Sequence, residues 1–396
     1  MQTILTLNSG SSSIKFSVFS LEASGITKKY SGTVVNIKQK PNLKIKSAAG
    51  DVLVNQNINP NPNIKDIYED VIHQILEWLK TQNITIIGAG HRVAHGGIMY
   101  RKATIINPTV ISNLEKLIPL APLHQPYNTN GAKILAKEFP EIPQVVCFDT
   151  AFHTTCNHLS QLFAIPKYLT DEGVIRYGFH GLSYKYVVSQ FDKYLPKDKV
   201  NKKIIIAHLG QGATMCAIEN KQSVATSIGF SALDGLPMGT RTGTIDAGVI
   251  LYLSAEKKMS YKEIEELLYK KSGLLGVSGI SSDMKELEES NDPNAKLAID
   301  LFVYRINGWI GSLAAELGGL DGIIFTAGIG ENSPLIRAKV CEKASWLGVK
   351  IDSELNNKNS HTISTHDSKI FVGVIPTDEE TVIAMETFNL LAYVIF

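Results

Sequence analysis

A strand–turn–strand pattern occurs twice in this 396-residue chain. The two copies read TILTLNSGSSSIKFSVF, from Thr3, and KIIIAHLGQGATMCAIE, from Lys203. Each joins two apolar, β-rich runs through a turn of small residues. This duplication predicts two similar domains that face each other across a cleft, with turns that could hold a phosphate chain through backbone N–H groups. Two ordinary hairpins remain the alternative interpretation, because Gly and Ser are common in any turn.

Further strands and helices alternate along the chain, which indicates an α/β fold. Apolar runs predict strands at 84–87, 144–148, 203–209 and 322–327. Apolar spacing and capping residues predict helices at 63–80, 293–317, from 334 to near 348, and 382–391, the last behind a capping box that begins at Thr377. The polar segment 36–63 is expected to be an excursion within a domain.

Composition excludes several classes of protein. Lys and Arg total 39 against 38 Asp and Glu, so the chain lacks the basic excess of a nucleic-acid-binding surface. No apolar run approaches the length of a membrane span, and the N-terminus does not resemble a signal peptide. The four cysteines show no CxxC pairing, which favours a reducing cytosol. Only six basic residues are Arg, so we expect some of them at sites that need a planar, bidentate cation.

A third Gly-rich segment follows the strand at 322–327. Gly328-Ile329-Gly330-Glu331-Asn332 is expected to form a loop that lets a nucleotide approach a helix N-terminus. The segment lacks the third Gly of the dinucleotide-binding fingerprint, and the chain has no GxxxxGK[ST] sequence. Alone it is a weak signal, but with the two duplicated turns it favours phosphate binding.

The segment HRVAHGG, from His91 to Gly97, is expected to be a loop because of its paired glycines. His91 and His95 stand four apart, a spacing that would suit a metal on a helix, but no carboxylate lies nearby in sequence. We therefore favour Arg92 as an anion ligand over a zinc site.

Three other polar residues stand at positions where catalytic groups often lie. Asp149 directly follows a predicted buried strand, where α/β sheets present ligand-binding groups; a helix cap or turn is the alternative. His180 lies between glycines at a predicted helix start, and Arg241 lies in a glycine-flanked loop; packing and a surface turn are the alternatives. Two arginines, a His and an Asp together indicate phosphoryl transfer from a nucleotide to a small anion, with a divalent metal.

The ordered motifs resemble those of acetate kinases, which belong to the acetate and sugar kinase, Hsp70 and actin superfamily. These motifs are NSGSSSIKF, HRVAHGG, APLHQPYN, FDTAFH, RYGFHGLS, HLGQGAT, MGTRTG, SGLLGVSGISSDM, FTAGIGEN and IPTDEE. The resemblance spans residue 4 to about residue 384. It implies duplicated ribonuclease H-like domains with a cleft between them: residues 1–150 plus 381–396 on the acyl side, and 151–380 on the nucleotide side.

The resemblance also implies a role for each matching residue. Asn8 and Glu379 would hold Mg²⁺ (Mn²⁺ is an alternative), and Arg92 would hold the substrate carboxylate. Asp149, His180 and Arg241 would be catalytic, with His124 nearby, and the acyl pocket would be walled by Val93, Leu123, Phe179 and Ala232. ATP or ADP would contact Lys15, His208, Leu209, Gly210, Gln211, Gly212, Asp283, Met284, Lys285, Gly328, Ile329, Gly330, Glu331 and Asn332.

The implied reaction is direct in-line transfer between ATP and acetate, which gives acetyl phosphate and ADP in a cytoplasmic homodimer without membrane or nucleic-acid partners. Because a carboxylate is already ionised at neutral pH, Asp149 is expected to orient groups rather than to remove a proton. The apolar segment 301–317 could contribute to the dimer or be an internal helix.

Five residues depart from the family pattern. Gln211 replaces Asn, Thr244 replaces Asp, Ala247 replaces Pro, Lys285 replaces Arg, and Ala232 replaces a Pro that commonly walls the acyl pocket. A propionate or other short-chain acyl kinase is therefore the nearest alternative. More distant alternatives are an actin-like or Hsp70-like nucleotide switch, and a kinase that the changes at 211 and 244 have disabled.

Overall fold

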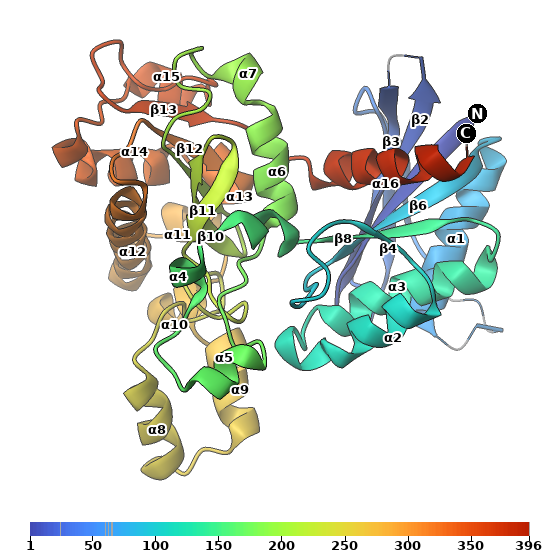
Figure 1. The fold of residues 1–396 in the computed structure, drawn as a ribbon, viewed down its shortest axis with the longest axis horizontal. Coiled ribbons are helices and arrows are strands. Elements are labelled where there is room, and N and C mark those ends of the chain that lie inside the picture. Colours follow the sequence, from blue (N-terminus) through green and yellow to red (C-terminus); the bar gives the residue numbers. More distant parts are fainter. Residues whose placement is uncertain (24, 60, 62, 65, 396) are drawn as a thin grey trace. The chain divides into compact units, whose positions relative to one another are not determined.

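The computed structural model describes residues 1–23, 25–59, 61, 63–64 and 66–395. The chain divides into two compact units, Met1–Ala151 with Asp378–Phe396, and Phe152–Thr377. Each unit contains one sheet with helices on both faces (Figure 1). The expected limits, 1–150 plus 381–396 and 151–380, differ from these by a few residues, because the last helix begins at Glu379 and packs on the first sheet.

The sheet of the first unit has the strand order β5-β4-β3-β2-β1-β6-β8-β7. Strands β1, β2 and β3 are antiparallel neighbours, whereas β6 and β8 run parallel to β1. The predicted excursion at 36–63 contains β4 and β5, which extend one edge of this sheet. Its strands are β1 (Gln2–Ser9), β2 (Ser13–Glu22), β3 (Gly25–Val35), β4 (Asn42–Ser47), β5 (Val52–Asn57), β6 (Thr85–Val93), β7 (Thr104–Ile105) and β8 (Gln144–Phe148).

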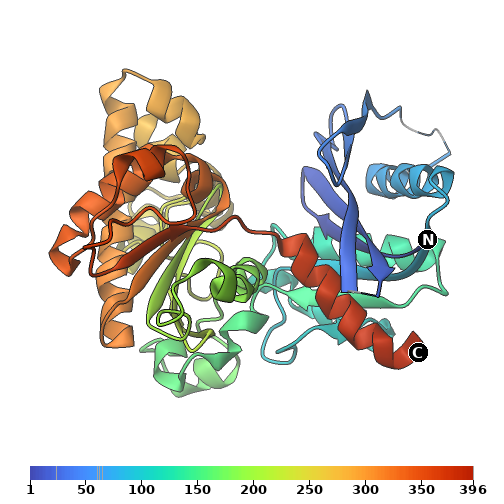
Figure 2. The same cartoon turned by 90° about the horizontal axis from the view of Figure 1, so that it is seen from above.

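Alternate residues of these strands face different helices. Leu5 and Leu7 pack with α1 and α3, whereas Ile4 faces α16. Figure 2 shows α16, in red, lying along the sheet. The helices of this unit are α1 (Ile67–Thr81), α2 (Pro108–Lys116), α3 (Gln125–Glu138) and α16 (Glu379–Ile395). The helix predicted at 63–80 begins at Ile67 because Asp66 caps it. Likewise Asp378, rather than Thr377, caps α16: its Oδ1 accepts from the backbone N–H of Thr381 at 3.1 Å.

The glycines before Arg92 lie within a strand rather than in a loop. A Cβ atom on Gly90 would lie 2.3 Å from Oγ1 of Thr387, and one on Gly88 would lie 2.4 Å from Leu391, both on α16. The glycines therefore allow α16 to lie close against the sheet. The strand predicted at 84–87 continues as β6 to Val93, so the loop expected at 91–97 is wrong for His91, Arg92 and Val93, which lie on the strand.

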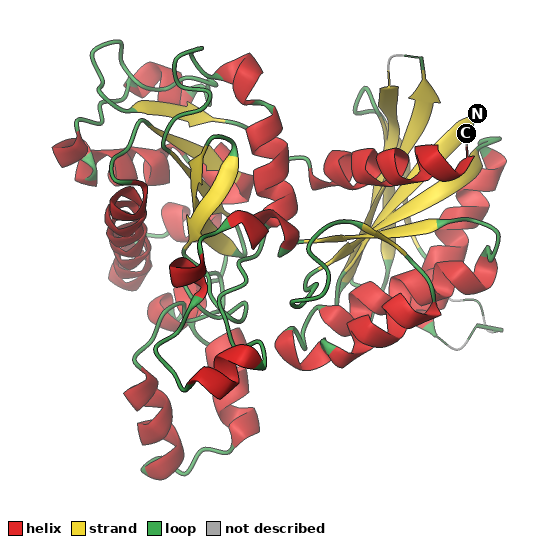
Figure 3. Cartoon of the chain, in the orientation of Figure 1, coloured by secondary structure: helices red, strands yellow, loops and turns green. Residues whose placement is uncertain are grey.

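The sheet of the second unit has the order β11-β10-β9-β12-β13. Strands β9, β10 and β11 are antiparallel neighbours, and β12 and β13 run parallel to β9. This repeats the order and directions of β3-β2-β1-β6-β8, so the duplicated sequence pattern corresponds to a duplicated topology (Figure 3). The strands are β9 (Ile204–Leu209), β10 (Ala213–Glu219), β11 (Gln222–Thr226), β12 (Gly322–Thr326) and β13 (Phe371–Val374).

The helices of the second unit cover both faces of its sheet. Ile204 and Ile206 pack with α6 and α7, whereas Ile205, Ala207 and Leu209 face the core formed with α12 and α14. The helices are α4 (His158–Gln161), α5 (Lys167–Asp171), α6 (Gly181–Ser189), α7 (Phe191–Tyr194), α8 (Ala247–Ala255), α9 (Tyr261–Lys270), α10 (Gly273–Ser278), α11 (Met284–Glu289), α12 (Pro293–Leu317), α13 (Ala327–Asn332), α14 (Pro334–Lys343) and α15 (Ser353–Asn357).

The apolar segment 301–317 belongs to a helix of the core. Within α12, Phe302, Ile306, Ile310 and Leu313 are almost fully buried in the second unit. The helix starts with Asp292 as its cap and Pro293 at its first position, and it ends at Gly318, as predicted. Among the helices that the structure describes, none combines the length and apolar content needed to cross a bilayer.

Candidate active site

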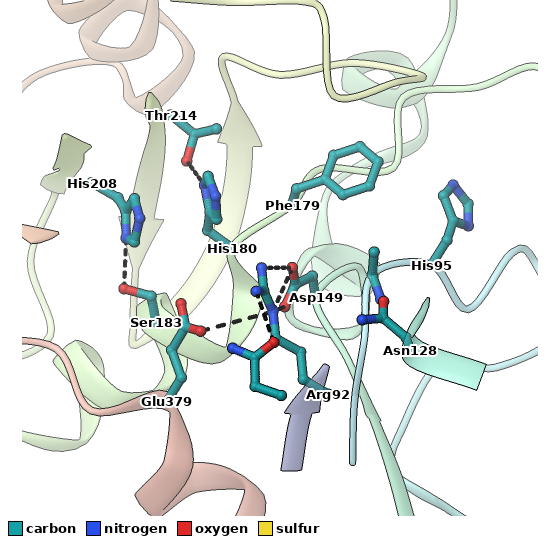
Figure 4. A network of polar contacts seen from close by, with 12 residues as sticks. Arg92, His95, Asn128, Asp149, Phe179, His180, Ser183, His208, Thr214 and Glu379 are labelled. Atoms are coloured by element: carbon teal, nitrogen blue, oxygen red, sulfur yellow. Dashed lines mark hydrogen bonds and ion pairs between the residues drawn. The ribbon is translucent and has the colours of Figure 1, made fainter. Parts of the chain in front are cut away.

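The first unit brings polar side chains together where parallel strands end. Asn8 is near the end of β1, Arg92 near the end of β6, and Asp149 directly follows β8. Because these strands are parallel neighbours, their carboxyl ends meet at one edge of the sheet. Glu379, the first residue of α16, joins the same cluster (Figure 4).

Arg92 and Asp149 form a two-pronged contact. The Nε and Nη2 atoms of Arg92 donate to the Asp149 carboxylate at 3.1 and 2.7 Å, and Nη1 donates to Oδ1 of Asn8 at 3.4 Å. These bonds use three of the five N–H groups of a guanidinium, and the other two have no acceptor among the described residues. Asp149 therefore orients Arg92 and leaves part of its fork for an anion.

Burial gives the cluster unusual acid–base properties. The side chain of Glu379 lies 3.8 Å from Nε of Arg92 and is 15% exposed. Burial raises the pKa of Glu379 to about 7; Arg92 opposes this shift, and the neighbouring Asp149 and Glu380 add to it. Burial lowers the pKa of Arg92, but the charges of Asp149 and Glu379 outweigh burial and raise it above its ordinary value. Arg92 is therefore a permanent cation.

Buried amides that sequence reasoning missed hold the backbone beside Arg92. Asn128 on α3 accepts from the N–H of Ala94 at 3.0 Å and donates to the carbonyl of Ser9 at 2.7 Å. Gln125 accepts from the N–H of His95 at 3.2 Å and donates to its carbonyl oxygen at 3.0 Å. The signal was two amides three residues apart at the start of an otherwise packed helix, within the segment APLHQPYN.

The other predicted residues of the first unit surround this cluster less directly, although the charge of Lys15 lowers the pKa of Glu379. Val93 is fully buried, Leu123 is half-buried, and His124 occupies the cap position of α3. Lys15 is exposed on β2, opposite Asn8 in the strand register.

Three distant segments of the second unit line one cavity of about 670 Å³. They are the turn after β9, the start of α11, and the start of α13 with the residues that follow it. Eight residues predicted for the nucleotide lie on its wall: Gly210, Gln211, Asp283, Met284, Lys285, Gly328, Ile329 and Asn332. The cavity thus unites residues more than a hundred positions apart in the chain.

The prediction of a loop at 328–332 is wrong. It forms α13, whose first residue, Ala327, has a φ of 65°. Glu331 accepts from the backbone N–H groups of Ala327 and Thr377 at 2.7 and 3.0 Å, so its side chain holds the backbone and does not line the cavity. Gly330 and Leu209 are buried and do not line it either.

Two stacked histidines lie next to the turn after β9. The rings of His180 and His208 have centroids 4.2 Å apart at an interplanar angle of 16°. His180 is the cap residue of α6, with a φ of 54°, and it follows Phe179, which is 5% exposed. A Cβ atom on Gly212 would lie 3.1 Å from Cε1 and Nε2 of His180, so this glycine lets the ring face the turn.

The loop that carries Arg241 is held from several sides. Nη1 of Arg241 donates to the carbonyl of Ala232 at 3.1 Å, and the carbonyl of Arg241 accepts from the N–H of Met238 at 3.0 Å. Ala232 is 9% exposed. Thr244 at the base of the loop donates to Asp234 at 2.7 Å and accepts from the N–H of Gly235 at 3.1 Å.

The described residues offer no all-protein metal cage, since no group of three or more His, Cys, Asp and Glu side chains is arranged to hold an ion. Burial lowers the pKa of both His91 and His95 to about 4. His91 contacts the Gln144 side chain at 2.7 Å, and Nδ1 of His95 accepts from the N–H of Gly97 at 2.9 Å. Both are buried structural residues.

The sequence matches one protein family over nearly its whole length. A sequence profile described as the acetokinase family matches residues 3–385. The chain belongs to this family. Its members include acetate kinases of Rickettsia felis, 48% identical over 98% of this chain and 99% of that protein, and of Nitrobacter hamburgensis, 47% identical over 99% and 96%.

Solved structures of acetate and propionate kinases share the whole fold. A propionate kinase from Francisella tularensis is 37% identical and superposes with a TM-score of 0.91 over 98% of this chain and 100% of its own. The acetate kinase of Porphyromonas gingivalis, also 37% identical, gives 0.86 over 99% and 100%. The duplicated actin- and Hsp70-type fold is therefore confirmed.

The structure accounts for several departures from the acetokinase pattern. Thr244 replaces a charged residue but still bonds Asp234 and Gly235, so the base of the Arg241 loop stays anchored. Ala247 is the first residue of α8 behind its cap, Asp246, a position that accepts Pro or other residues. Lys285 is exposed and pairs with Glu289 at 3.8 Å.

Proposed function

We propose that this chain catalyses the reversible transfer of the γ-phosphoryl group of ATP to acetate, giving acetyl phosphate and ADP. The observation that carries the proposal is the Asp149–Arg92 contact in a member of the acetokinase family, because it presents part of a guanidinium fork at the carboxyl ends of parallel strands. A planar fork of this kind matches a carboxylate or a phosphoryl group.

Each polar group then has one task. The N–H groups of Arg92 that Asp149 and Asn8 leave available hold the acetate carboxylate, and the cavity beside Gly210 and Asp283 holds the nucleotide. The acetate oxygen attacks the γ-phosphorus in line with the leaving ADP oxygen. His180 and Arg241 donate N–H groups to the equatorial oxygens, where charge is spread in the transition state. No proton has to leave the nucleophile.

Asn8, Asp149 and Glu379 fit a Mg²⁺ or Mn²⁺ ion that they would hold partly through bound water. Amide and carboxylate oxygens suit these cations, and a cation here would favour the charged form of Glu379, whose pKa burial raises. Mg²⁺ usually binds through one or two carboxylates together with substrate phosphates, so a full protein cage is not needed. When bound, the cation would offset phosphate charge.

Propionate is the second candidate substrate. Ala232, which supplies the carbonyl for Arg241, is smaller than the Pro of the family pattern, and a pocket discriminates a methylene by only about 1–3 kcal/mol. The likeness to a propionate kinase also favours this alternative. We further propose a homodimer, as well as a cytoplasmic location because ATP is an intracellular substrate.

The test is a hydroxamate assay for acyl phosphate with acetate, propionate and butyrate. We expect acetate to give the highest kcat/KM, with propionate used less well. A tenfold preference for propionate would replace acetate as the substrate, and no acyl phosphate from any acid would refute the kinase function. ATP binding without turnover would support a disabled kinase.

A matched pair of arginine variants makes the assay specific. Arg241→Lys should lower kcat on the order of 10³-fold, because Lys lacks the planar fork. Arg305→Lys is the control, since Arg305 is exposed on α12 and has no hydrogen bond or ion pair among the described residues. Light scattering of the same samples measures the oligomeric state.

A further inference from the structure

The stacked histidines of the second unit are bonded to buried hydroxyl groups. We propose that these hydroxyls fix His180 and His208 as neutral imidazoles protonated on Nε2, so that the pair presents two parallel N–H donors to the phosphate chain. This inference rests on the proposed function and deepens it by assigning Thr214, Tyr184 and Ser183 as positioning residues.

The first step is the chain of hydroxyls behind His180. The phenol of Tyr184 and the hydroxyl of Thr214 are 2.5 Å apart. The Thr214 hydroxyl lies 3.0 Å from Nδ1 of His180 (Figure 4). Both Tyr184 and Thr214 are 0% exposed, so bulk solvent does not reach these hydroxyls. Within the described part of the chain, neither hydroxyl has another hydrogen-bond partner.

Counting protons fixes the direction of these bonds. Tyr184 has one hydroxyl proton, and its sole acceptor among the described residues is Thr214; burial also raises the pKa of Tyr184, so the phenol keeps this proton. The proton of Thr214 must then go to Nδ1 of His180. If Nδ1 carried a proton, one buried hydroxyl hydrogen would have no acceptor, which is unfavourable. Nδ1 is therefore the acceptor, and the ring proton is on Nε2.

The same reasoning applies to His208. The hydroxyl of Ser183 lies 2.8 Å from Nδ1 of His208, and Ser183 is 0% exposed. Among the described residues, Nδ1 of His208 is the sole hydrogen-bond partner of this hydroxyl. If Nδ1 carried a proton, the buried hydroxyl hydrogen would have no acceptor, so Ser183 donates and His208 also carries its proton on Nε2.

The placement of the rings explains why a neutral tautomer with Nε2–H would suit phosphate binding. The two rings are nearly parallel at 4.2 Å, and Nε2 of His180 faces Gly212 of the turn after β9. Two stacked imidazolium cations would repel each other, whereas two neutral rings do not. A neutral N–H donor needs no change of protonation when the phosphoryl group passes, so its hydrogen bonds are ready before reaction.

The experiment is nuclear magnetic resonance of the full-length enzyme with ¹⁵N-labelled histidine. Long-range ¹H–¹⁵N spectra distinguish the two neutral tautomers and the imidazolium, and the variants His180→Gln and His208→Gln assign the signals. We expect each ring at neutral pH to carry its proton on Nε2. Protonation of Nδ1 in either ring of the wild type would overturn the inference. This measurement needs no substitution of Thr214, Tyr184 or Ser183.

The kinetics of Thr214 variants provide the second measurement. Thr214→Val keeps the shape of the side chain but removes the hydroxyl, so His180 should lose its single-tautomer spectrum and kcat should fall about 10- to 100-fold, with a smaller change in the KM for ATP. Thr214→Ser is the matched control, and it should retain the single-tautomer spectrum of His180 and the kcat of the wild type. Unchanged kcat and an unchanged His180 spectrum in Thr214→Val would refute the role of Thr214.

The two proposals can fail separately. Formation of acetyl phosphate by the wild type tests the proposed function alone. If the wild type forms acetyl phosphate but has Nδ1 protonated in His180, only the inference about the histidine tautomers is overturned. A wild type without turnover but with both protons on Nε2 would overturn only the proposed function.

Discussion

The carboxylate of Asp149 accepts from both Nε and Nη2 of Arg92, at 3.1 and 2.7 Å. The Asp149 side chain is 2% exposed, whereas that of Arg92 is 20% exposed. A buried carboxylate thus fixes a partly accessible guanidinium from one side. The orientation of Arg92 is set before any ligand arrives, which reduces the cost of ordering it on binding.

This relationship predicts strongly coupled effects of substitutions at the two positions. Arg92→Lys should lower kcat/KM for acetate on the order of 10³-fold, since Lys does not replace the fork. Asp149→Asn should also lower it, because Arg92 loses its orienting partner. The double variant should be little worse than the worse single variant. Steady-state kinetics of the four proteins measure the coupling, and additive losses would contradict a shared task.

The proposed place of Ala232 in the acyl pocket predicts a change of substrate preference on substitution. The backbone N–H of Ala232 makes no hydrogen bond among the described residues, while its carbonyl accepts from Arg241. Pro keeps that carbonyl and adds bulk. Ala232→Pro should therefore lower kcat/KM for propionate relative to acetate by about tenfold. Ala232→Gly is the control with less bulk, and an unchanged ratio in both variants would place Ala232 outside the acyl pocket.

The sequence predicted well those features that depend on local chemistry. Buried strands, the capped helix α12, and the duplicated strand–turn–strand pattern each carry their signal within a few residues. Asp149 was predicted at a strand end and lies there.

The sequence predicted poorly what depends on contacts with distant residues. The predicted strand stopped at residue 87, but β6 continues through Gly88 and Gly90. The small size of these glycines serves the approach of α16, which lies about 300 positions later in the chain. Gln125 and Asn128 were not identified, because an amide that bonds a distant backbone has no local pattern. The Gly-rich segments at 210–212 and 328–332 indicated phosphate binding by their own pattern, but the third wall of the cavity, at the start of α11, could be proposed only from the resemblance.

The close contact between α16 and β6 predicts a loss of stability for Gly90→Ala. The added Cβ atom would lie 2.3 Å from Thr387 and 2.5 Å from Ile383, both on α16, so the helix must shift. We expect a loss of about 1–3 kcal/mol in the free energy of unfolding. Gly308→Ala in α12 is the control: its Cβ atom would meet nothing within 4 Å, and it should stabilise the protein by up to about 1 kcal/mol. Equal melting temperatures for the two variants would refute the packing argument.

Three buried histidines predict that stability falls as the solution becomes acidic. Burial lowers the pKa of His91, His95 and His153 to about 4, against about 6.5 in an unfolded chain. Between these values the unfolded state binds more protons, so stability is full above about pH 6.5 and is lost as the pH falls towards 4. Each histidine should cost about 2 kcal/mol by about pH 5. Urea unfolding across this range measures the loss. His91→Gln should make the dependence shallower by about 1.4 kcal/mol per pH unit in the transition of the first unit, and an unaltered slope would show that His91 is already charged in the folded protein.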